Sequence, residues 1–209
     1  MTIKPYYQSD RVTLYHGDCL EVLPTLGAGS VDAVVTSPPY NTLNPGAKPS
    51  GVHADRKRGV NVWMDKQGGY FDQRPEPEYQ EWQRSVFAEC MRVAPLVWIN
   101  HKTRYRNGEG IHPLHIYKDA PIYAEVVWDR GGSMALNCKR YAPSHEYFIA
   151  FGRPRVWNDK NNTKMSVWQI APRKGKIPGN DHPSPYPVEL VQPLVESSDG
   201  GRGILEAAQ

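Results

Sequence analysis

The sequence predicts an α/β fold in which helices cover both faces of a central sheet, within one domain spanning residues 1–209. Residues 31–36, VDAVVT, form a short apolar run rich in β-branched residues, typical of a strand buried on both faces in a parallel sheet. From Glu76 to Val93, apolar residues recur at helical spacing and acidic residues gather near the N-terminal end. Strand-like runs then follow at residues 96–99, 122–128 and 147–151.

The N-terminal part predicts a strand and a short helix ahead of the buried strand. Residues 12–15 have strand character, and residues 19–26 have helical character. Asp18 precedes that helix and suits its N-cap, while the Gly-rich residues 27–30 end it. The order is therefore strand, helix, strand.

Three further segments complete the expected order. Residues 41–75 are rich in Gly, Pro and charged residues without a sustained period, which predicts a long mobile loop of functional importance. A short helix is expected near residues 111–117. A last helix should begin at Pro187, a residue suited to the first helical position, because apolar residues from 188 to 195 share one face.

Composition excludes several classes of protein. Hydrophobic residues make up 39% of the 209 residues and charged residues 22%, as in globular soluble domains. Neither an apolar run of about 18 residues nor an apolar signal region is present, so we expect no membrane span and no secretion. The spacing of Cys19, Cys90 and Cys138 fits neither a disulfide framework nor a Cys-x-x-Cys metal site, which favours a reducing cytoplasm.

Positive charge is concentrated in residues 101–180. This region carries 14 Lys/Arg against 6 Asp/Glu, whereas the rest of the chain has a net charge of −5. Such a division predicts a region that faces a polyanion, with a merely solvated basic surface as the alternative. The candidate phosphate contacts are Lys102, Arg104, Arg106, Arg130, Lys139, Arg140 and Lys174, with Arg173 and Lys176 beside the last.

The buried strand ends at Ser37-Pro38-Pro39-Tyr40. Two prolines make a stiff, non-helical exit without backbone donors, and the carboxyl end of a strand in an open α/β sheet is where ligands bind. The Ser37 hydroxyl and the adjoining carbonyls could hold an exocyclic amine, while the Tyr40 ring stacks on its heterocycle. Taken alone, the tetrapeptide is better explained as a rigid turn, and it is the apolar strand before it, residues 31–36, that favours a ligand site.

The pair His112-x-x-His115 is a weaker candidate, for a metal site. Two histidines one helical turn apart can bind zinc, but no Glu-x-x-His pattern or cysteine pair completes the set. We therefore expect no metal and assign these histidines to packing or to the surface.

Residues 17–41, GDCLEVLPTLGAGSVDAVVTSPPYN, resemble the target-amine motif region of DNA methyltransferases that methylate amino groups with S-adenosylmethionine. The similarity continues in EVVWDRGG and KRYAPSHEYFIAF, within residues 125–151, and in HPSPYPVELV, residues 182–191. The serine form of the motif is most associated with N4-cytosine methylation, and this motif order resembles the permuted, beta-like class. The resemblance implies a Rossmann-like methyltransferase sheet.

The resemblance also implies roles for individual residues. Ser37 and the carbonyl of Pro38 would bind the amine of a base flipped out of double-stranded DNA, with Pro39 stiffening the motif and Tyr40 stacking on the base. The residues implied at the cofactor are Asp18, near the adenosine, and His182, Pro183 and Pro185, near the methionine. For Asp18, helix capping is a compatible second role.

The chain departs from this family at its C-terminal end. The family continues into a strand and a glycine-rich turn that holds the cofactor, whereas this sequence ends in SSDGGRGILEAAQ. Ile204 and Leu205 could begin that strand, with Glu206 at the acidic position. We therefore expect a sheet incomplete at this end, with residues 31–36 lacking a neighbour and exposing an edge to a complementing chain or a second copy.

The function predicted from the sequence is site-specific DNA methylation, with N4 of cytosine favoured over N6 of adenine, in a restriction-modification or phage system. The shortened chain would be inactive alone if it needs a complementing polypeptide. The alternative is a catalytically dead remnant that binds DNA or regulates, and a metal-dependent hydrolase built on His112 and His115 is a distant third.

Overall fold

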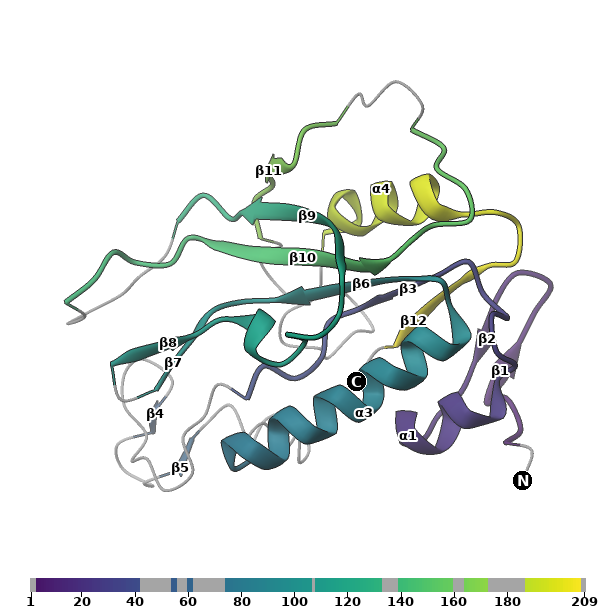
Figure 1. The fold of residues 1–209 in the computed structure, drawn as a ribbon, viewed down its shortest axis with the longest axis horizontal. Helices are drawn as coiled ribbons and strands as arrows, with labels where there is room; N and C mark the ends of the chain where they lie inside the picture. Colours follow the sequence, from purple (N-terminus) through teal and green to yellow (C-terminus); the bar gives the residue numbers. More distant parts are fainter. Residues whose placement is uncertain are drawn as a thin grey trace.

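The computed structural model describes residues 3–41, 54–55, 60–61, 74–106, 108–132, 139–159, 164–172 and 187–207. Its centre is a six-stranded mixed sheet (Figure 1). Across the sheet the strands are β11 (Val167–Gln169), β9 (Ile122–Asp129), β10 (His145–Gly152), β6 (Leu96–His101), β3 (Ala33–Thr36) and β12 (Ile204–Ala207). β3 is parallel to both β6 and β12, as its apolar run predicts, whereas β10 is antiparallel to β6 and β9.

One face of the sheet is covered by α3 (Glu76–Val93), whose bounds are those the periodicity predicts. Val34, Val97 and Ile149 of the sheet form a buried cluster with Tyr79 and Val93 of α3. On the same side lie the short helix α1 (Cys19–Val22) and the 3-10 helix η1 (Leu23–Thr25), which both contact α3 (Figure 1).

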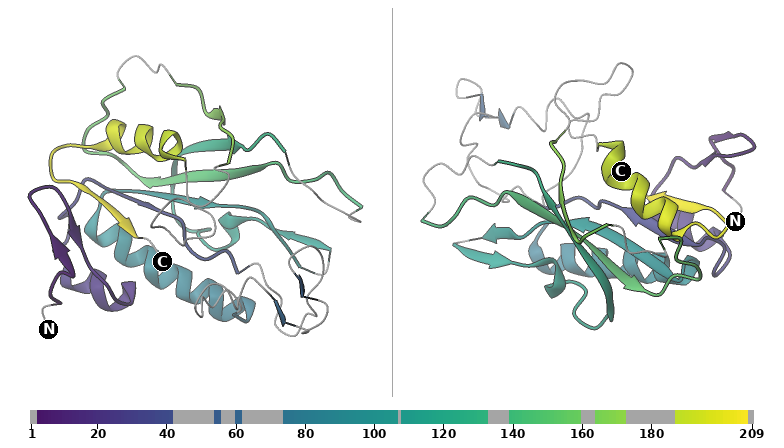
Figure 2. Two further views of the ribbon diagram at one scale, coloured as in Figure 1. Left: turned by 180° about the vertical axis from the view of Figure 1, so that it is seen from behind. Right: turned by 90° about the horizontal axis from the view of Figure 1, so that it is seen from above.

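The opposite face is covered by α4 (Val188–Ser198), as Figures 1 and 2 show. Leu190 and Leu194 of α4 pack with Ala33, Val35 and Trp98. Successive residues of β3 therefore point to opposite layers, and both layers are apolar because both faces are covered. The expectation of helices on both faces is confirmed. Pro187 caps α4 instead of occupying its first helical position, a one-residue shift from the prediction.

Short strand pairs and a 3-10 turn flank this core. The chain begins with the hairpin of β1 (Tyr7–Gln8) and β2 (Thr13–Leu14), and β4 (Ala54–Asp55) pairs with β5 (Val60–Asn61). The hairpin of β7 (Arg104–Arg106) and β8 (Glu109–Ile111) extends beyond the end of β6 and was not predicted. The short helix expected at residues 111–117 is the 3-10 helix η2 (Pro113–His115).

The exposed sheet edge is not where the sequence predicts it. β12 pairs in parallel with β3 along its length, so β3 has a strand on each side and residues 31–36 do not form an edge. Among the described residues, β12 is the last strand on that side. The prediction was wrong because residues 204–207 already form the neighbour of β3, whereas the sequence suggested Ile204, Leu205 and Glu206 only as the beginning of that strand.

A buried carboxylate ties β12 to β3. Asp32, 1% exposed, accepts hydrogen bonds from the backbone N–H groups of Gly200 (2.9 Å) and Arg202 (2.7 Å) and pairs with Arg155 (3.2 Å). Burial alone would raise its pKa, but these donors hold the pKa of Asp32 below its usual value. The turn that leads into β12 is thus anchored at the start of β3.

Among the helices that the structure describes, none combines the length and apolarity needed to cross a membrane. Most of the loop predicted at residues 41–75 lies outside the described residues.

Candidate functional site

The Ser37-Pro38-Pro39-Tyr40 motif follows β3 directly, at the carboxyl end of a strand flanked by two parallel neighbours. This is the end of an open α/β sheet at which ligands bind. Pro38 is buried, and the other three residues are half-buried. The motif therefore lies at the surface of the core with its polar groups near the open end of the sheet.

Residues of β6 and β10 surround the Tyr40 hydroxyl. It donates to Oδ1 of Asn100, lies 3.1 Å from Oε2 of Glu146, and accepts a hydrogen bond from Ser37 Oγ at 3.1 Å. Glu146 is 5% exposed, and its other oxygen pairs with Arg130 at 2.9 Å. The motif, two strands and one basic side chain thus share a single polar network.

The ring of Tyr40 stacks on His101, with 4.8 Å between centroids and 29° between planes. The ammonium group of Lys102 lies 5.0 Å from the Tyr40 centroid, a cation–π distance. His101 covers one face of the ring, so a base would have to stack on the other face.

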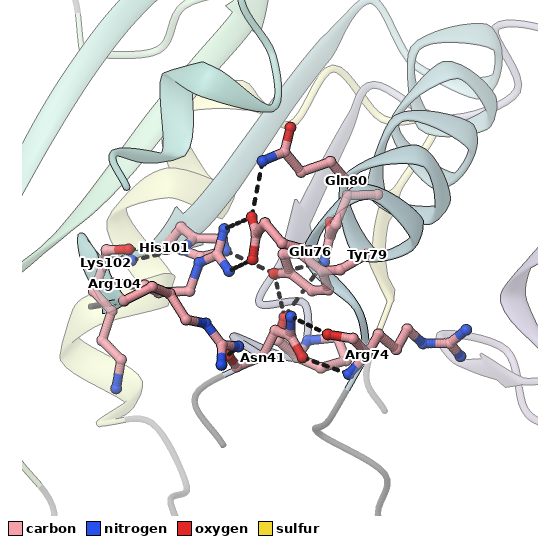
Figure 3. Close-up of polar contacts among 11 residues, drawn as sticks. Asn41, Arg74, Glu76, Tyr79, Gln80, His101, Lys102 and Arg104 are labelled. Carbon is pink, nitrogen blue, oxygen red and sulfur yellow. Dashed lines mark hydrogen bonds and ion pairs between the residues drawn. The ribbon is translucent and has the colours of Figure 1, made fainter. Parts of the chain in front are cut away.

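A second network, on the α3 side, holds the backbone of the motif (Figure 3). The Tyr79 hydroxyl lies 2.6 Å from the carbonyl of Pro39 and 2.9 Å from Nε2 of His101, and it accepts from Gln83 at 3.1 Å. A carbonyl carries no proton, so Tyr79 must donate to Pro39, and His101 must therefore donate from Nε2. Nδ1 is then the acceptor for the backbone N–H of Lys102 at 2.8 Å, and the carbonyl of Lys102, 2.9 Å from the same nitrogen, receives no proton from it.

Burial keeps the His101 ring uncharged. His101 has no solvent exposure, and burial lowers its pKa to about 3, with a further lowering from Arg104 and Lys102. The ring is therefore neutral at physiological pH. On the other side of Gln83, its Oε1 accepts from Tyr117 at 2.9 Å, which completes a chain of buried, satisfied polar groups.

The residue after the motif, Asn41, forms a clamp that the sequence reading missed. Its side chain donates to the carbonyl of Arg74 (3.0 Å) and accepts from the backbone N–H of Arg74 (2.7 Å), as Figure 3 shows. Its backbone φ is 51°, a left-handed conformation that asparagine tolerates better than most residues. Asn41 thus turns the chain directly after Tyr40 and joins this turn to the start of α3.

Beside the motif lies a cavity of about 260 Å³. Four of the residues predicted to contact phosphate line it, and their side chains make it basic; the lining comprises Asn41, Lys102, Thr103, Arg104, Tyr105, Arg106, Arg130, Pro143 and His145. The structure thus brings together Lys102, Arg106 and Arg130 at the site, and their role in DNA binding stays a prediction.

Arg104 differs from its neighbours in the cavity wall. Its side chain is 3% exposed, and its two terminal nitrogens bind both oxygens of Glu76 at 2.6 and 2.7 Å (Figure 3). Its guanidinium also lies 4.6 Å from the ring centroid of Tyr79. Although burial opposes ionisation of Glu76, the pairing with Arg104 keeps the pKa of Glu76 low. Arg104 thus supports the motif through Glu76 and Tyr79, and its contact with phosphate stays a prediction.

The other predicted residues lie in different places. Asp18 is exposed and caps α1, accepting from the backbone N–H of Leu20 at 2.8 Å, which confirms its capping role. Arg140 lies 3.8 Å from the ring centroid of Tyr105, at the hairpin of β7 and β8, and Lys139 beside it is exposed. Outside the described residues are His182, Pro183, Pro185 and Lys174. No group of three or more potential metal ligands occurs among the residues described.

The sequence is similar to known bacterial enzymes. The Type II methyltransferase M.ScaI of Streptomyces caespitosus is 24% identical over 241 residues, an alignment that covers 97% of this chain and 71% of M.ScaI. The Type II methyltransferase M.BglII of Bacillus subtilis is also 24% identical, over 88% of this chain and 56% of its own length.

The fold is shared with solved structures of low sequence identity. The cytosine-N4-specific PvuII DNA methyltransferase superposes with a TM-score of 0.65 at 16% identity, over 97% of this chain and 76% of its own. A Thermus thermophilus protein assigned as a DNA modification methylase, complexed with S-adenosyl-L-methionine, gives 0.55 at 21% identity, over 92% and 76%. The model of the N6/N4 DNA methylase family matches residues 31–201, most of this sequence. On this evidence the chain belongs to the N6/N4 DNA methylase family.

Proposed function

We propose that this protein transfers a methyl group from S-adenosylmethionine to the exocyclic amine of a flipped base in double-stranded DNA, with N4 of cytosine favoured. The observation that carries the proposal is the Ser-Pro-Pro-Tyr motif at the carboxyl end of β3, fixed on both sides by buried networks and bordered by a basic cavity. Family membership supports the reaction class, and the cytosine-N4 activity named for the PvuII enzyme supports the choice of base.

In this reaction, Ser37 and the carbonyl of Pro38 bind the two hydrogens of the target amine. We assign the backbone role to Pro38 because Tyr79 already occupies the Pro39 carbonyl. Acceptors at both hydrogens pull the nitrogen towards tetrahedral geometry, which frees its lone pair from conjugation with the ring. The lone pair forms the bond to the methyl carbon while the carbon–sulfur bond of the donor breaks, sulfur keeps its electron pair, and the nitrogen loses one proton to water.

Among the described residues, Asp18 is the one that we assign to the binding of S-adenosylmethionine. The exposed carboxylate of Asp18 can accept a hydrogen bond from the adenosine while it caps α1. S-adenosylmethionine supplies a methyl group on a sulfonium centre, and the remaining work of the protein is orientation and electrostatics. Cofactor roles for His182, Pro183 and Pro185 stay predictions.

The cavity supports DNA as the substrate. Lys102, Arg106 and Arg130 lie close to the motif and present positive charge where the phosphates next to a flipped base would lie. A complementing chain or second copy would add at the outer side of β12, the last strand on that side among the residues described.

A direct test is incubation of the purified protein with methyl-tritiated S-adenosylmethionine and unmethylated bacteriophage DNA, followed by mass spectrometry of the nucleosides. We expect label in DNA as N4-methyldeoxycytidine, and loss of at least about 100-fold in rate for Ser37→Ala. The matched control is Ser85→Ala, a change on the exposed side of α3.

The outcomes separate the readings. N6-methyldeoxyadenosine would change the base but keep the reaction. Salt-sensitive DNA binding that is indifferent to the cofactor, with no transfer even when the test is repeated with extracts of the source cells, would overturn the enzyme and favour a DNA-binding remnant.

A further inference from the structure

The directions of the hydrogen bonds at Tyr40 follow from the chemistry of its partners. Asn100 donates from Nδ2 to the carbonyl of Tyr147 at 3.0 Å, so its Oδ1 is the atom that faces Tyr40. An amide oxygen only accepts. The single hydroxyl proton of Tyr40 therefore lies on the side of Asn100 and Glu146, and not on the side of Ser37.

Glu146 places a group without a hydrogen-bond donor next to the Tyr40 hydroxyl oxygen. Its Oε2 lies 3.1 Å from the Tyr40 hydroxyl, and the guanidinium of Arg130 at 2.9 Å from Oε1 stabilises the ionised carboxylate. An ionised carboxylate has no proton to donate. An amide at this position could donate to Tyr40 and displace the proton of Ser37, whereas a carboxylate cannot.

The oxygen of Tyr40 is consequently an acceptor for Ser37, whose Oγ lies 3.1 Å away. A free serine hydroxyl can rotate and present either a proton or a lone pair to a ligand. Once its proton is bound to Tyr40, Ser37 presents lone pairs only. Lone pairs are what an amine with two hydrogens requires from this residue.

We propose that Glu146 is a positioning residue which acts through Tyr40 to make Ser37 a hydrogen-bond acceptor for the amine of the target base. This inference rests on the proposed function and adds a residue, outside the Ser-Pro-Pro-Tyr motif, that determines how the motif works. Arg130 is the second part of the device, because it pairs with Oε1 of Glu146 at 2.9 Å and at the same time lines the basic cavity.

The test is a double-mutant cycle between Glu146→Gln and Ser37→Ala, with single-turnover methylation of bacteriophage DNA as the readout. We expect Glu146→Gln to lower the rate about tenfold in the wild-type background, with little change in DNA affinity, and to have no further effect when Ser37 is already alanine. The matched control is Glu89→Gln, the same substitution in the ion pair with Arg92 (2.8 Å) on α3, and it should leave the rate unchanged.

A second readout needs neither cofactor nor DNA. In proton NMR spectra of the free protein, the bonded Tyr40 hydroxyl should give a slowly exchanging signal, assigned by its absence in Tyr40→Phe. We expect Glu146→Gln to shift this signal and speed its exchange, and Glu89→Gln to leave it in place.

The inference is overturned if Glu146→Gln methylates at the wild-type rate, or if it lowers the rate equally with and without the Ser37 hydroxyl, which would indicate a merely structural role. A wild-type protein that shows the hydroxyl signal but transfers no methyl group to any DNA would instead overturn the proposed function, and the inference with it.

Discussion

The two sides of the Ser-Pro-Pro-Tyr motif are built on different principles. On the α3 side, Tyr79, His101 and Gln83 form a buried, neutral network whose endpoint is the backbone carbonyl of Pro39. On the β10 side, Glu146 and Arg130 form a charged network whose endpoint is the hydroxyl of Tyr40, next to the basic cavity. The neutral network holds the motif backbone in position, and the charged network determines the directions of the hydrogen bonds at the Tyr40 and Ser37 hydroxyl groups.

This comparison teaches that stability and activity should separate experimentally. Loss of a partner in a buried neutral network leaves unsatisfied groups in the core, a cost that appears in the free energy of unfolding. Loss of a partner on the charged side changes hydrogen-bond direction at the site, a cost that appears in the rate of the chemical step.

The largest effect on folding is expected from Tyr79→Phe. The change removes the donor to Pro39 and leaves His101 and Gln83 without their shared acceptor, so the free energy of unfolding should fall by about 3 kcal/mol. Urea denaturation followed by circular dichroism measures it. Tyr105→Phe, on a partly exposed ring of the β7 and β8 hairpin, is the control and should change stability by less than about 0.5 kcal/mol. Equal losses for the two variants would contradict the network.

Tyr40→Phe should affect the rate as well as the stability, because it also removes a donor to the buried side chains of Asn100 and Glu146. The ring and its stacking on His101 remain, but Ser37 loses the acceptor of its proton, so the methylation rate should fall about 100-fold, equivalent to about 2.7 kcal/mol. Single-turnover kinetics and the same denaturation assay would be compared. A variant that loses stability as Tyr79→Phe does, with its rate intact, would remove the distinction between the two sides.

The pH dependence of stability provides a smaller but sharper test. His101 is neutral in the folded protein, with a pKa lowered by burial to about 3, and it protonates near pH 6.5 when unfolded. The unfolded state therefore binds more protons between these values, so stability falls on acidification, at up to about 1.4 kcal/mol per pH unit.

This contribution can be separated from that of the carboxylates. The lowered pKa values of Asp32 and Glu76 make them lose their stabilisation only as the pH falls through about 4 and below. Between pH 6.5 and 5, His101→Gln should therefore flatten the stability curve. His112, whose pKa burial also lowers, stays in both proteins and contributes equally. An unchanged slope in this window would mean that His101 does not titrate as proposed.

The smallest effect is expected in the cavity. Lys102→Ala should weaken the salt dependence of non-specific duplex binding. The slope of log K against log salt should become shallower by about one unit, because one phosphate contact is lost. Fluorescence anisotropy with a labelled duplex measures the slope. Lys118→Ala removes an exposed lysine that does not line the cavity and should leave it unchanged. Identical slopes for both variants would remove Lys102 from the DNA interface.

Much of the fold was predictable because its signals are local. The periodicity of residues 76–93 predicts both bounds of α3, and the apolar run of residues 31–36 predicts a buried strand, which the structure has at residues 33–36. The hairpin of β7 and β8 was missed because Arg104, Tyr105 and Arg106 suggest a surface that binds phosphate, and no local pattern reveals that Arg104 pairs with a residue 28 positions earlier. The partner of β3 was misplaced since pairing between strands about 170 residues apart is a tertiary property.

The candidate site was predicted in its centre and missed in its support. The motif itself is contiguous, whereas Asn41, Asn100 and Glu146 act through contacts that cross the sequence. One signal was available in the sequence. Glu146 shares a strand face with Phe148 and Ala150, both fully buried, and a buried carboxylate requires an ion-pair or hydrogen-bond partner. Asn100 gives a similar signal, because it is a polar residue near the end of the apolar run at residues 96–101 and a buried amide needs hydrogen-bond partners.

The clamp between Asn41 and Arg74 joins the two ends of the chain segment that lies between them. Its two hydrogen bonds bring together the ends of the segment between them, so the length of that segment hardly affects the geometry of the motif. Doubling a closed loop costs only about 0.6 kcal/mol of entropy. A change in the length of this segment is therefore expected to leave the position of the Ser-Pro-Pro-Tyr motif unchanged.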